Sequence, residues 1–177
     1  VFARPDTDWE ALAARVEGLG PKTILGGHLH YADGAVMHAG MTILRDAVIR
    51  PAPPAPPLFA PVLLRVDHPL KGAPALLQPD APQAVEAVTG SFMLIPRALW
   101  RELGGLSEDY VLAYYEDADF CLRARAAGAE ILCDPALRLI HLEGRGSGGD
   151  GPGPAAGAML FNRCLFTERH AGAGQAA

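Results

Sequence analysis

Three carboxylates stand close together in the segment YYEDADFCLR, which runs from Tyr114 to Arg123. Glu116, Asp117 and Asp119 lie within four residues, directly ahead of an apolar pattern with helical spacing. One explanation is the start of a helix, because the free amide groups and the dipole of a helix favour acidic residues in its first turn. The other is a site that handles protons or metal ions, where clustered carboxylates are common. The spacing by itself leaves both explanations open.

Helical geometry separates the directions of these side chains. Glu116 and Asp119 are three residues apart and share a face, whereas Asp117 is rotated by about 100° from Glu116. The three side chains therefore cannot all cap the same helix. Their mutual repulsion should raise the pKa of at least one of them, at a cost in stability unless a cation, a substrate hydroxyl or backbone amide groups compensate.

A histidine further along the chain stands where a site would be expected. His141 ends the strand-like pattern LRLIH and immediately precedes a glycine-rich loop. Open α/β sheets place their ligands at the carboxyl ends of strands. A lone histidine at such a position is more often a hydrogen-bonded structural residue, but together with the carboxylates we interpret His141 as functional.

Two other histidines and one arginine carry weaker signals. His28 and His30 are two residues apart on an expected strand and share a face, so they could chelate a metal, but two solvent-facing histidines are the favoured interpretation. Arg145, in the loop EGRGSG, could reach a diphosphate, because arginine pairs well with phosphate and its glycine neighbours permit a close approach. A solvated loop arginine explains the same residue equally well.

The elements that must position these residues alternate between helices and strands. A helix is expected in TDWEALAARVEGLG, where Thr7 and Glu10 form a capping pair and glycines end the pattern. KTILGGHLHYADGAVMHAGMTIL is expected to form a strand, a turn and a strand, and AVEAVTGSFMLI (84–95) a further strand. The expected helices that follow are PRALWRELGG, YEDADFCLRARAAGAE and MLFNRCLFTERHA, with one or two strands in EILCDPALRLIHL. Strands interleaved with helices indicate an α/β sheet.

A proline-rich segment interrupts this order. RPAPPAPPLFAPV, from Arg50 to Val62, holds six prolines and is not expected to form a helix or a central strand. It could be a polyproline ligand for a partner, but a surface excursion within one domain is the favoured interpretation. We expect a main unit over residues 1–150 with this insertion at 50–67, and a glycine-rich loop with a closing helix over residues 151–177.

Composition argues against several classes of protein. The 177 residues are 50% hydrophobic with a net charge of −5, so the chain can form a core but lacks the basic surface of a nucleic-acid-binding protein. Its three cysteines form neither a Cys-x-x-Cys metal pair nor an even disulfide set, which fits a reducing compartment. No apolar run is long enough to span a bilayer, so a soluble protein is expected. The first residue is Val1 rather than Met, which indicates a fragment or a processed piece of a longer protein.

The second half of the chain resembles a known family of enzymes. VTGSFMLIPRALWRELGGLSEDYVLAYYEDADFCLRARAAGAEILCDPALRLIHLEGRGS, from Val88 to Ser147, is similar to the second half of the catalytic domain of family 2 inverting glycosyltransferases of the rhamnosyl- and galactofuranosyl-transferase type. GGHLHYADGAVMHAGM and FNRCLFTER resemble two further stretches of that domain, the second being its closing helix. The resemblance implies a GT-A-like fold of the nucleotide-diphospho-sugar transferases, a mixed α/β sheet flanked by helices.

The first half of that family's domain is not found in this sequence. The family has a nucleotide-binding βαβ region that ends in an Asp-x-Asp metal motif, and Val1 aligns just after the place where this motif should end. The segment PDTD has the right letters in Asp6 and Asp8, but it lies inside the capping signal of the first helix. The resemblance therefore implies the carboxyl-terminal, acceptor-side part of the domain, without its nucleotide-binding half, and this polypeptide alone could be inactive.

The resemblance assigns roles residue by residue. Asp117 matches the general base, and Glu116 is the other acid of the pair at the helix start. Asp119 matches a further acid that contacts the acceptor or the protein itself. Small residues that pass close to the donor sugar and the acceptor fall on Gly90 and Ser91. The metal-binding histidine of the family falls on His141, with Mn²⁺ or Mg²⁺ as the implied cofactor.

The implied activity is inverting transfer of a sugar from a nucleotide-sugar donor to a glycan or lipid-linked acceptor in cell-surface polysaccharide synthesis. A sugar hydroxyl is a poor nucleophile, so a positioned carboxylate must take its proton as it attacks the anomeric carbon, while a cation neutralises the departing diphosphate. The implied location is the cytoplasm, with association at the inner membrane surface left open.

Two other functions compete with this interpretation. The first is a degenerate, non-catalytic glycosyltransferase-like module that binds a partner or a carbohydrate, which the missing Asp-x-Asp motif favours. The second is a metal-dependent hydrolase, which needs more metal ligands than the sequence offers. The sequence does not identify the sugar, the nucleotide, the acceptor or the oligomeric state.

Overall fold

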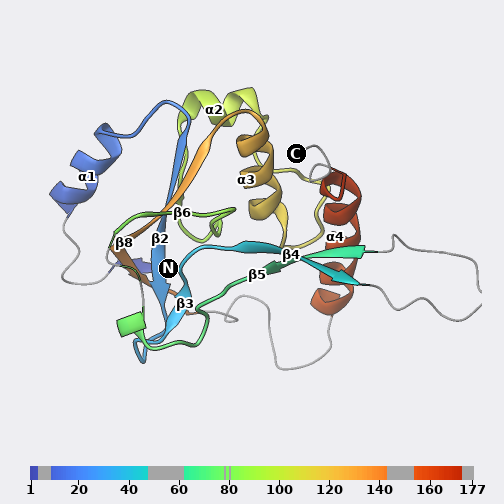
Figure 1. Ribbon diagram of the computed structural model, residues 1–177, viewed down its shortest axis with the longest axis horizontal. Coiled ribbons are helices and arrows are strands. Elements are labelled where there is room, and N and C mark those ends of the chain that lie inside the picture. Colours follow the sequence, from blue (N-terminus) through green and yellow to red (C-terminus); the bar gives the residue numbers. More distant parts are fainter. Residues whose placement is uncertain (4–8, 48–61, 78, 80, 143–153, 173–177) are drawn as a thin grey trace, which may run out of the picture.

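The computed structural model describes residues 1–3, 9–47, 62–77, 79, 81–142 and 154–172 (Figure 1). In chain order the elements are β1 (Phe2–Ala3), α1 (Trp9–Glu17), β2 (Thr23–His30), β3 (Val36–His38), β4 (Thr42–Ala47), β5 (Val62–Asp67), the 3-10 helix η1 (Ala75–Leu77), β6 (Gln83–Ala84), β7 (Met93–Leu94), α2 (Arg97–Glu102), α3 (Glu116–Ala126), β8 (Glu130–Ile140) and α4 (Pro154–His170). The order confirms the predicted α/β class.

A mixed sheet built on β2 and β8 forms the main layer. These two strands run parallel to each other, and β8 pairs on its other side with β1, while β2 continues to β3. The short strands β6 and β7 pair antiparallel with β8 and β2. Helices flank this curled sheet, with α2 and α3 beside its upper part in Figure 1. Parallel strands need a long crossover, and here the residues between β2 and β8 supply it.

Two adjacent glycines allow β2 to lie inside the molecule. All eight residues of β2 are buried. A Cβ atom on Gly26 would lie 2.6 Å from Cγ1 of Val88, and one on Gly27 would lie 2.6 Å from the carbonyl oxygen of Leu137. Such distances are too short for any side chain, so glycine is required where neighbouring segments approach the strand this closely.

A second, two-stranded sheet extends from the main unit. β4 and β5 pair antiparallel from Thr42↔Asp67 to Ala47↔Val62, and α4 packs beside them (Figure 1). β5 occupies residues 62–67 of the segment that was predicted to be an insertion over 50–67. That end of the predicted insertion is therefore a regular strand, and residues 50–61 lie outside the described part of the chain.

Most predicted elements are confirmed, but one predicted strand is wrong. Helices form where expected, β2 and β3 form the predicted strand pair, and EILCDPALRLI forms one long strand. Of the predicted strand over 84–95, only Ala84 in β6 and the two residues of β7 are regular strand, with an isolated bridge from Ala87 to Met41. Between β6 and β7 the backbone turns, because the N–H of Phe92 donates to the carbonyl of Thr89 (3.2 Å) instead of pairing with a strand. Thr7 of the predicted capping pair lies outside the described residues.

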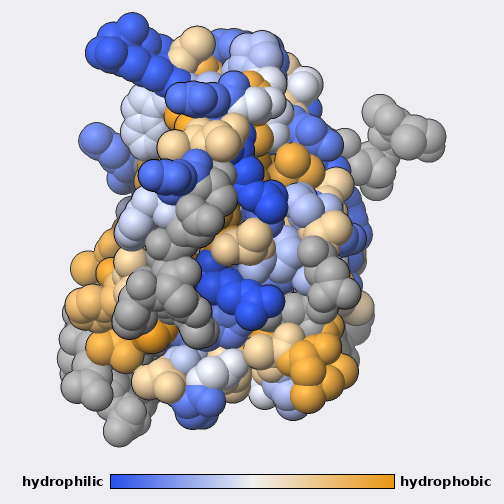
Figure 2. All heavy atoms as spheres, turned by 90° about the vertical axis from the view of Figure 1, so that its left-hand side faces the viewer, coloured by the Kyte–Doolittle hydropathy of each residue, from blue (hydrophilic) through white to orange (hydrophobic). Residues whose placement is uncertain are grey.

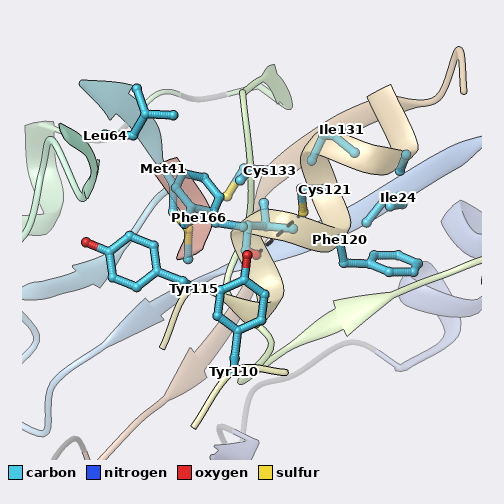
Figure 3. Close-up of a cluster of buried hydrophobic side chains, with 14 of the residues drawn as sticks. Ile24, Met41, Leu64, Tyr110, Tyr115, Phe120, Cys121, Ile131, Cys133 and Phe166 are labelled. Carbon is cyan, nitrogen blue, oxygen red and sulfur yellow. Dashed lines mark hydrogen bonds between the residues drawn. The ribbon is translucent and has the colours of Figure 1, made fainter. Parts of the chain in front are cut away.

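The main core connects both sheets with the helices. Figure 3 shows its side chains, with Phe120 on α3, Phe166 on α4 and Ile131 on β8 among the labelled residues. Phe120 and Phe166 have no exposed surface, and the rings of Phe166 and Tyr115 lie 5.2 Å apart. α4 is therefore packed into the core and holds α3 and β5 together.

The surface carries apolar side chains in separate groups. On the face shown in Figure 2, hydrophobic residues gather toward the lower end on both sides of a hydrophilic centre. The 3-10 helix η1 exposes Leu76 and Leu77, and α1 exposes Trp9. No helix among the described residues is both long and apolar enough to cross a membrane.

Candidate functional site

A short turn, Thr89–Ser91, connects the carboxylates of α3 with the histidine that follows β8. The N–H of Gly90 donates to Oδ2 of Asp117 at 2.9 Å. The hydroxyl of Ser91 lies 3.3 Å from Nε2 of His141. Four of the residues singled out in the sequence therefore meet at one place, although they come from three separate segments of the chain.

Asp117 is held by two backbone amides. Its Oδ2 accepts from Gly90, and its Oδ1 accepts from the N–H of Ala118 at 2.8 Å. A Cβ atom at position 90 would lie 3.4 Å from Cβ of Asp117, which is an ordinary van der Waals contact. Because a carboxylate has about four lone-pair sites, two remain for a ligand.

Glu116 lies at the start of α3 and is half-buried. Its Oε2 is buried and makes no hydrogen bond to any residue that the structure describes. Burial raises the pKa of Glu116, and the neighbouring charge of Asp117 raises it further. The prediction that one carboxylate of the cluster has a raised pKa is confirmed, although burial contributes more than repulsion does. An unsatisfied buried carboxylate oxygen is costly, so a hydrogen-bond donor that reached this atom would be stabilising.

Asp119 has a different environment from its two neighbours. Its side chain is fully buried and accepts from Nε of Arg123 (2.8 Å), Nε2 of His170 (2.8 Å) and the hydroxyl of Tyr110 (3.1 Å). Burial would raise the pKa of Asp119, but the hydrogen bonds from His170 and Arg123 outweigh it and lower the pKa. Of the two roles that the sequence left open, the geometry favours the contact within the protein, because Asp119 connects α3 to α4.

His141 is held at the end of the paired strands. Its backbone N–H donates to the carbonyl of His30 at 2.9 Å, which extends the pairing of β2 and β8 by one residue. Its side chain is half-buried and contacts Ser91. The predicted position of His141 at the end of a strand is confirmed.

The interpretation of His28 and His30 as solvent-facing residues is wrong. Their side chains are 1% and 4% exposed. The reason is that β2 is covered on both faces, so residues of either parity are buried. Neither the residue types nor the alternation in HLH could reveal this, because the cover comes from segments far away in the sequence.

Sequence reasoning missed His38, which supports the Thr89–Ser91 turn. Its Nε2 accepts from the N–H groups of Gly40 (3.3 Å) and Thr89 (3.4 Å), and its Nδ1 lies 3.1 Å from Nδ1 of His68. Since Nε2 accepts, the proton of neutral His38 belongs on Nδ1, from which it is donated to His68. Burial lowers the pKa of His38 to about 3, helped by the charges of His68 and His28. The available sequence signal was a histidine that ends a strand just before a glycine.

The residues of the site do not by themselves fit a divalent cation. Among the described residues, no group of three or more His, Cys, Asp or Glu side chains is arranged to hold a metal ion. His141 would supply one ligand, and the others would have to come from elsewhere. Arg145, Asp6 and Asp8 lie outside the described residues. We therefore derive no chemical step through a metal.

Much of the chain is similar to an uncharacterized protein. No family model matches the chain. Over 124 residues, or 70% of the chain, the sequence is 30% identical to y4gI, an uncharacterized protein of Sinorhizobium fredii. The match covers only 12% of that much longer protein, so the chain spans a small part of its relative.

Proposed function

We propose that the chain is part of an inverting glycosyltransferase domain of the GT-A type, with Asp117 as the general base. The substrates would be a nucleotide-sugar donor and a glycan or lipid-linked acceptor. The observation that supports this most strongly is the Thr89–Ser91 turn, which donates to Asp117 through Gly90 and contacts His141 through Ser91. A carboxylate, a hydroxyl and an imidazole are thereby grouped along three residues of backbone.

The contacts of Asp117 suit the removal of a proton from a hydroxyl. The amides of Gly90 and Ala118 fix the plane of the carboxylate and leave lone pairs free for an acceptor. A sugar hydroxyl within about 2.6–3.2 Å could give its proton to Asp117 as its oxygen attacks the anomeric carbon. The new bond forms on the side opposite the departing diphosphate, so a single displacement inverts the anomeric configuration.

Glu116 and Ser91 can orient the acceptor beside that base. The buried Oε2 of Glu116, unpartnered among the described residues, would gain a hydrogen bond from a neighbouring acceptor hydroxyl. Ser91 offers a hydroxyl on the other side of Gly90. Holding the attacking oxygen in place raises the rate of transfer, because the entropy cost of bringing the acceptor to the donor is met when the acceptor binds. If Mn²⁺ or Mg²⁺ takes part, residues outside the described part of the chain must supply most of its ligands.

A non-catalytic binding module is the second candidate. It is favoured by the sequence, in which the family's Asp-x-Asp motif is not found. In that case the same turn would bind a carbohydrate without transferring it. A metal-dependent hydrolase ranks last, because it would need more metal ligands than the sequence offers and would use water in place of the acceptor.

The test is a product analysis with the protein at its natural length, purified from its source cells. The protein is incubated with a panel of nucleotide sugars, Mn²⁺ and candidate glycan acceptors, and the products are examined by mass spectrometry and NMR. Transfer with inverted anomeric configuration is expected. Retained configuration, or hydrolysis of the donor alone, would contradict the proposal. Saturable binding without turnover would favour the binding module.

A further inference from the structure

The segment directly ahead of α3 has an unusual backbone. Leu112, Tyr114 and Tyr115 have φ angles of 63°, 78° and 78°, and they are the only non-glycine residues with positive φ in the part of the chain that the structure describes. Residues other than glycine are disfavoured at positive φ because their Cβ atom comes too close to the backbone. Three such residues lie within four positions, directly ahead of Glu116 and Asp117, and must be held by their surroundings.

Burial holds only the carboxyl end of this segment, where Tyr115 is 9% exposed and its ring lies 5.2 Å from that of Phe166. Val111, Leu112, Ala113 and Tyr114 are all exposed, and Leu112 is 73% exposed. One internal hydrogen bond closes a tight turn around Leu112, from the N–H of Ala113 to the carbonyl of Val111 at 2.9 Å. A turn of this kind is strained on its own. The contacts that stabilise the exposed stretch 111–114 must therefore come from another element.

Those contacts come from one side chain of α4. Oδ1 of Asn162 accepts from the N–H of Val111 at 2.8 Å. Its Nδ2 donates to the carbonyls of Val111 (3.0 Å), Ala113 (2.8 Å) and Tyr114 (3.0 Å). Two hydrogens serve three carbonyls, so at least one bond is shared. Asn162 is fully buried, and its amide binds the segment at each end of the strained stretch.

We propose that Asn162 is a positioning residue for the candidate site, because it holds the segment Val111–Tyr115 in the conformation that sets Glu116 and Asp117 at the start of α3. Its effect on turnover rests on the proposed function, whereas its effect on the segment does not. The hydrogen bonds described for Asn162 go to Val111, Ala113 and Tyr114 and not to the site residues. Asn162 acts through the backbone. The last carbonyl that it binds is that of Tyr114, and Glu116 follows two residues later.

A matched control lies one turn and a half further along the same helix. Thr167 is 2% exposed, and its hydroxyl accepts from the N–H of Leu64 (2.9 Å) and donates to the carbonyl of Arg163 (2.8 Å). Thr167→Val removes polar contacts of α4 without touching the segment 111–115. Any effect that reflects only a weakened helix will therefore appear in both variants.

The experiment compares the wild-type chain with Asn162→Ala and Thr167→Val by NMR under conditions where each is folded. Hydrogen exchange of the Val111 amide measures how firmly Asn162 holds the segment 111–115. The carbon signal of the Glu116 carboxyl, followed against pH, measures the pKa of Glu116 in the candidate site. In Asn162→Ala we expect exchange at Val111 to accelerate about tenfold or more, as one lost hydrogen bond of ordinary strength would give. The pKa of Glu116 should fall toward its ordinary value as water reaches its side chain. Thr167→Val should change neither.

A rescue variant keeps the test decisive. Glycine accepts positive φ without strain, so Leu112→Gly added to Asn162→Ala should return part of the protection at Val111. If Asn162→Ala does not fold, Asn162→Leu takes its place, since leucine keeps the volume of the side chain and loses both the acceptor for Val111 and the donors. Unchanged exchange and titration in a folded variant, or equal changes in Thr167→Val, would overturn the proposal.

Turnover distinguishes the two proposals. If the natural protein transfers sugar, Asn162→Ala should lower kcat more than it changes KM for the donor, and Thr167→Val should leave both near wild type. If the wild-type protein transfers nothing, the proposed function fails. The exchange and titration results would still decide whether Asn162 positions the segment.

Discussion

At the scale of single residues, the candidate site depends on backbone groups as much as on side chains. The Gly90 amide orients Asp117, and the amides of Thr89 and Gly40 are in turn bound by His38. His38 can accept these two bonds only while its Nε2 carries no proton. The support of the turn is therefore sensitive to protonation, and that sensitivity gives a testable dependence on pH.

Lowering the pH should destabilise the protein through His38. The pKa of this residue is lowered from 6.5 to about 3 in the folded state, chiefly by burial. Between these values the unfolded chain binds a proton that the folded chain does not, so the free energy of unfolding falls as the pH falls through this window. The slope from one such group reaches about 1.4 kcal/mol per pH unit.

Urea denaturation at several pH values measures this effect. His38→Gln keeps an oxygen that can accept from the turn but removes the titration. The variant should therefore show a shallower loss of stability than the wild type between pH 6.5 and about 3. Equal pH dependence in both proteins would show that His38 does not titrate as described.

At the scale of elements, β2 and the segment ahead of α3 carry the tightest constraints. β2 must be free of side chains at Gly26 and Gly27, and the segment 111–115 must accept positive φ at three residues. Both constraints lie in the elements that lead to the site, since β2 carries the carbonyl that binds the His141 backbone. Each can be tested by a single substitution.

Gly27→Ala should destabilise the sheet. The added Cβ would lie 2.6 Å from the carbonyl oxygen of Leu137 and 3.0 Å from its Cβ, so backbone must move. Overpacking of this kind costs about 1–3 kcal/mol. Gly157→Ala is the control, because nothing lies within 4 Å of a Cβ there, and it should be neutral or stabilise the helix by up to about 1 kcal/mol. Similar unfolding free energies for the two variants would contradict the packing described for β2.

Leu112→Gly should stabilise the protein. The left-handed conformation costs a residue with a Cβ about 1–2 kcal/mol, while glycine loses about 0.5–1 kcal/mol more on folding through its greater freedom in the unfolded chain. A net gain of about 0.5 kcal/mol is expected in the free energy of unfolding. Val111→Gly, at the neighbouring exposed position without positive φ, should instead destabilise. The reverse order would show that the segment is not strained.

The sequence predicted those elements whose signals are local. The apolar spacing and acidic first turn of α3, the alternation of β8 and the proline ahead of α2 each produced the expected element. The strand over 84–95 is interrupted because Ala87 makes only an isolated bridge to Met41 and the backbone then turns at Thr89–Phe92, while Ala87 and Val88 are buried in the core. Asn162 could not be identified, because its four bonds reach about fifty residues back along the chain. His141 could be associated with the carboxylates from its place at a strand end, and the roles of His141 and Asp117 came from the family resemblance.

At the scale of the whole molecule, α4 connects the parts. It binds β5 through Thr167 and Arg163, the segment ahead of α3 through Asn162, and Asp119 through His170. Its Phe166 is fully buried in the main core. The two sheets and the candidate site should therefore lose structure together rather than in separate steps.

Phe166→Ala should cause a large, cooperative loss of stability. Replacing a fully buried phenylalanine by alanine costs about 3–5 kcal/mol. Denaturation followed at Tyr and Trp signals should keep a single transition, shifted to lower denaturant. Two resolved transitions, with β4, β5 and α4 separating from the main sheet, would contradict the connecting role of α4.

The most direct test of the central claim compares the sugar transfer rate and nucleotide-sugar binding of the natural-length protein with those of Asp117→Asn. Removing a general base costs about 10²–10⁴-fold in rate. We expect a loss of that size in kcat with donor binding retained, whereas Asp33→Asn, which changes a turn carboxylate bound only to the nearby Ala35 amide among the contacts described, should behave like the wild type. Turnover by Asp117→Asn at the wild-type rate would show that Asp117 is not the base and would contradict the account.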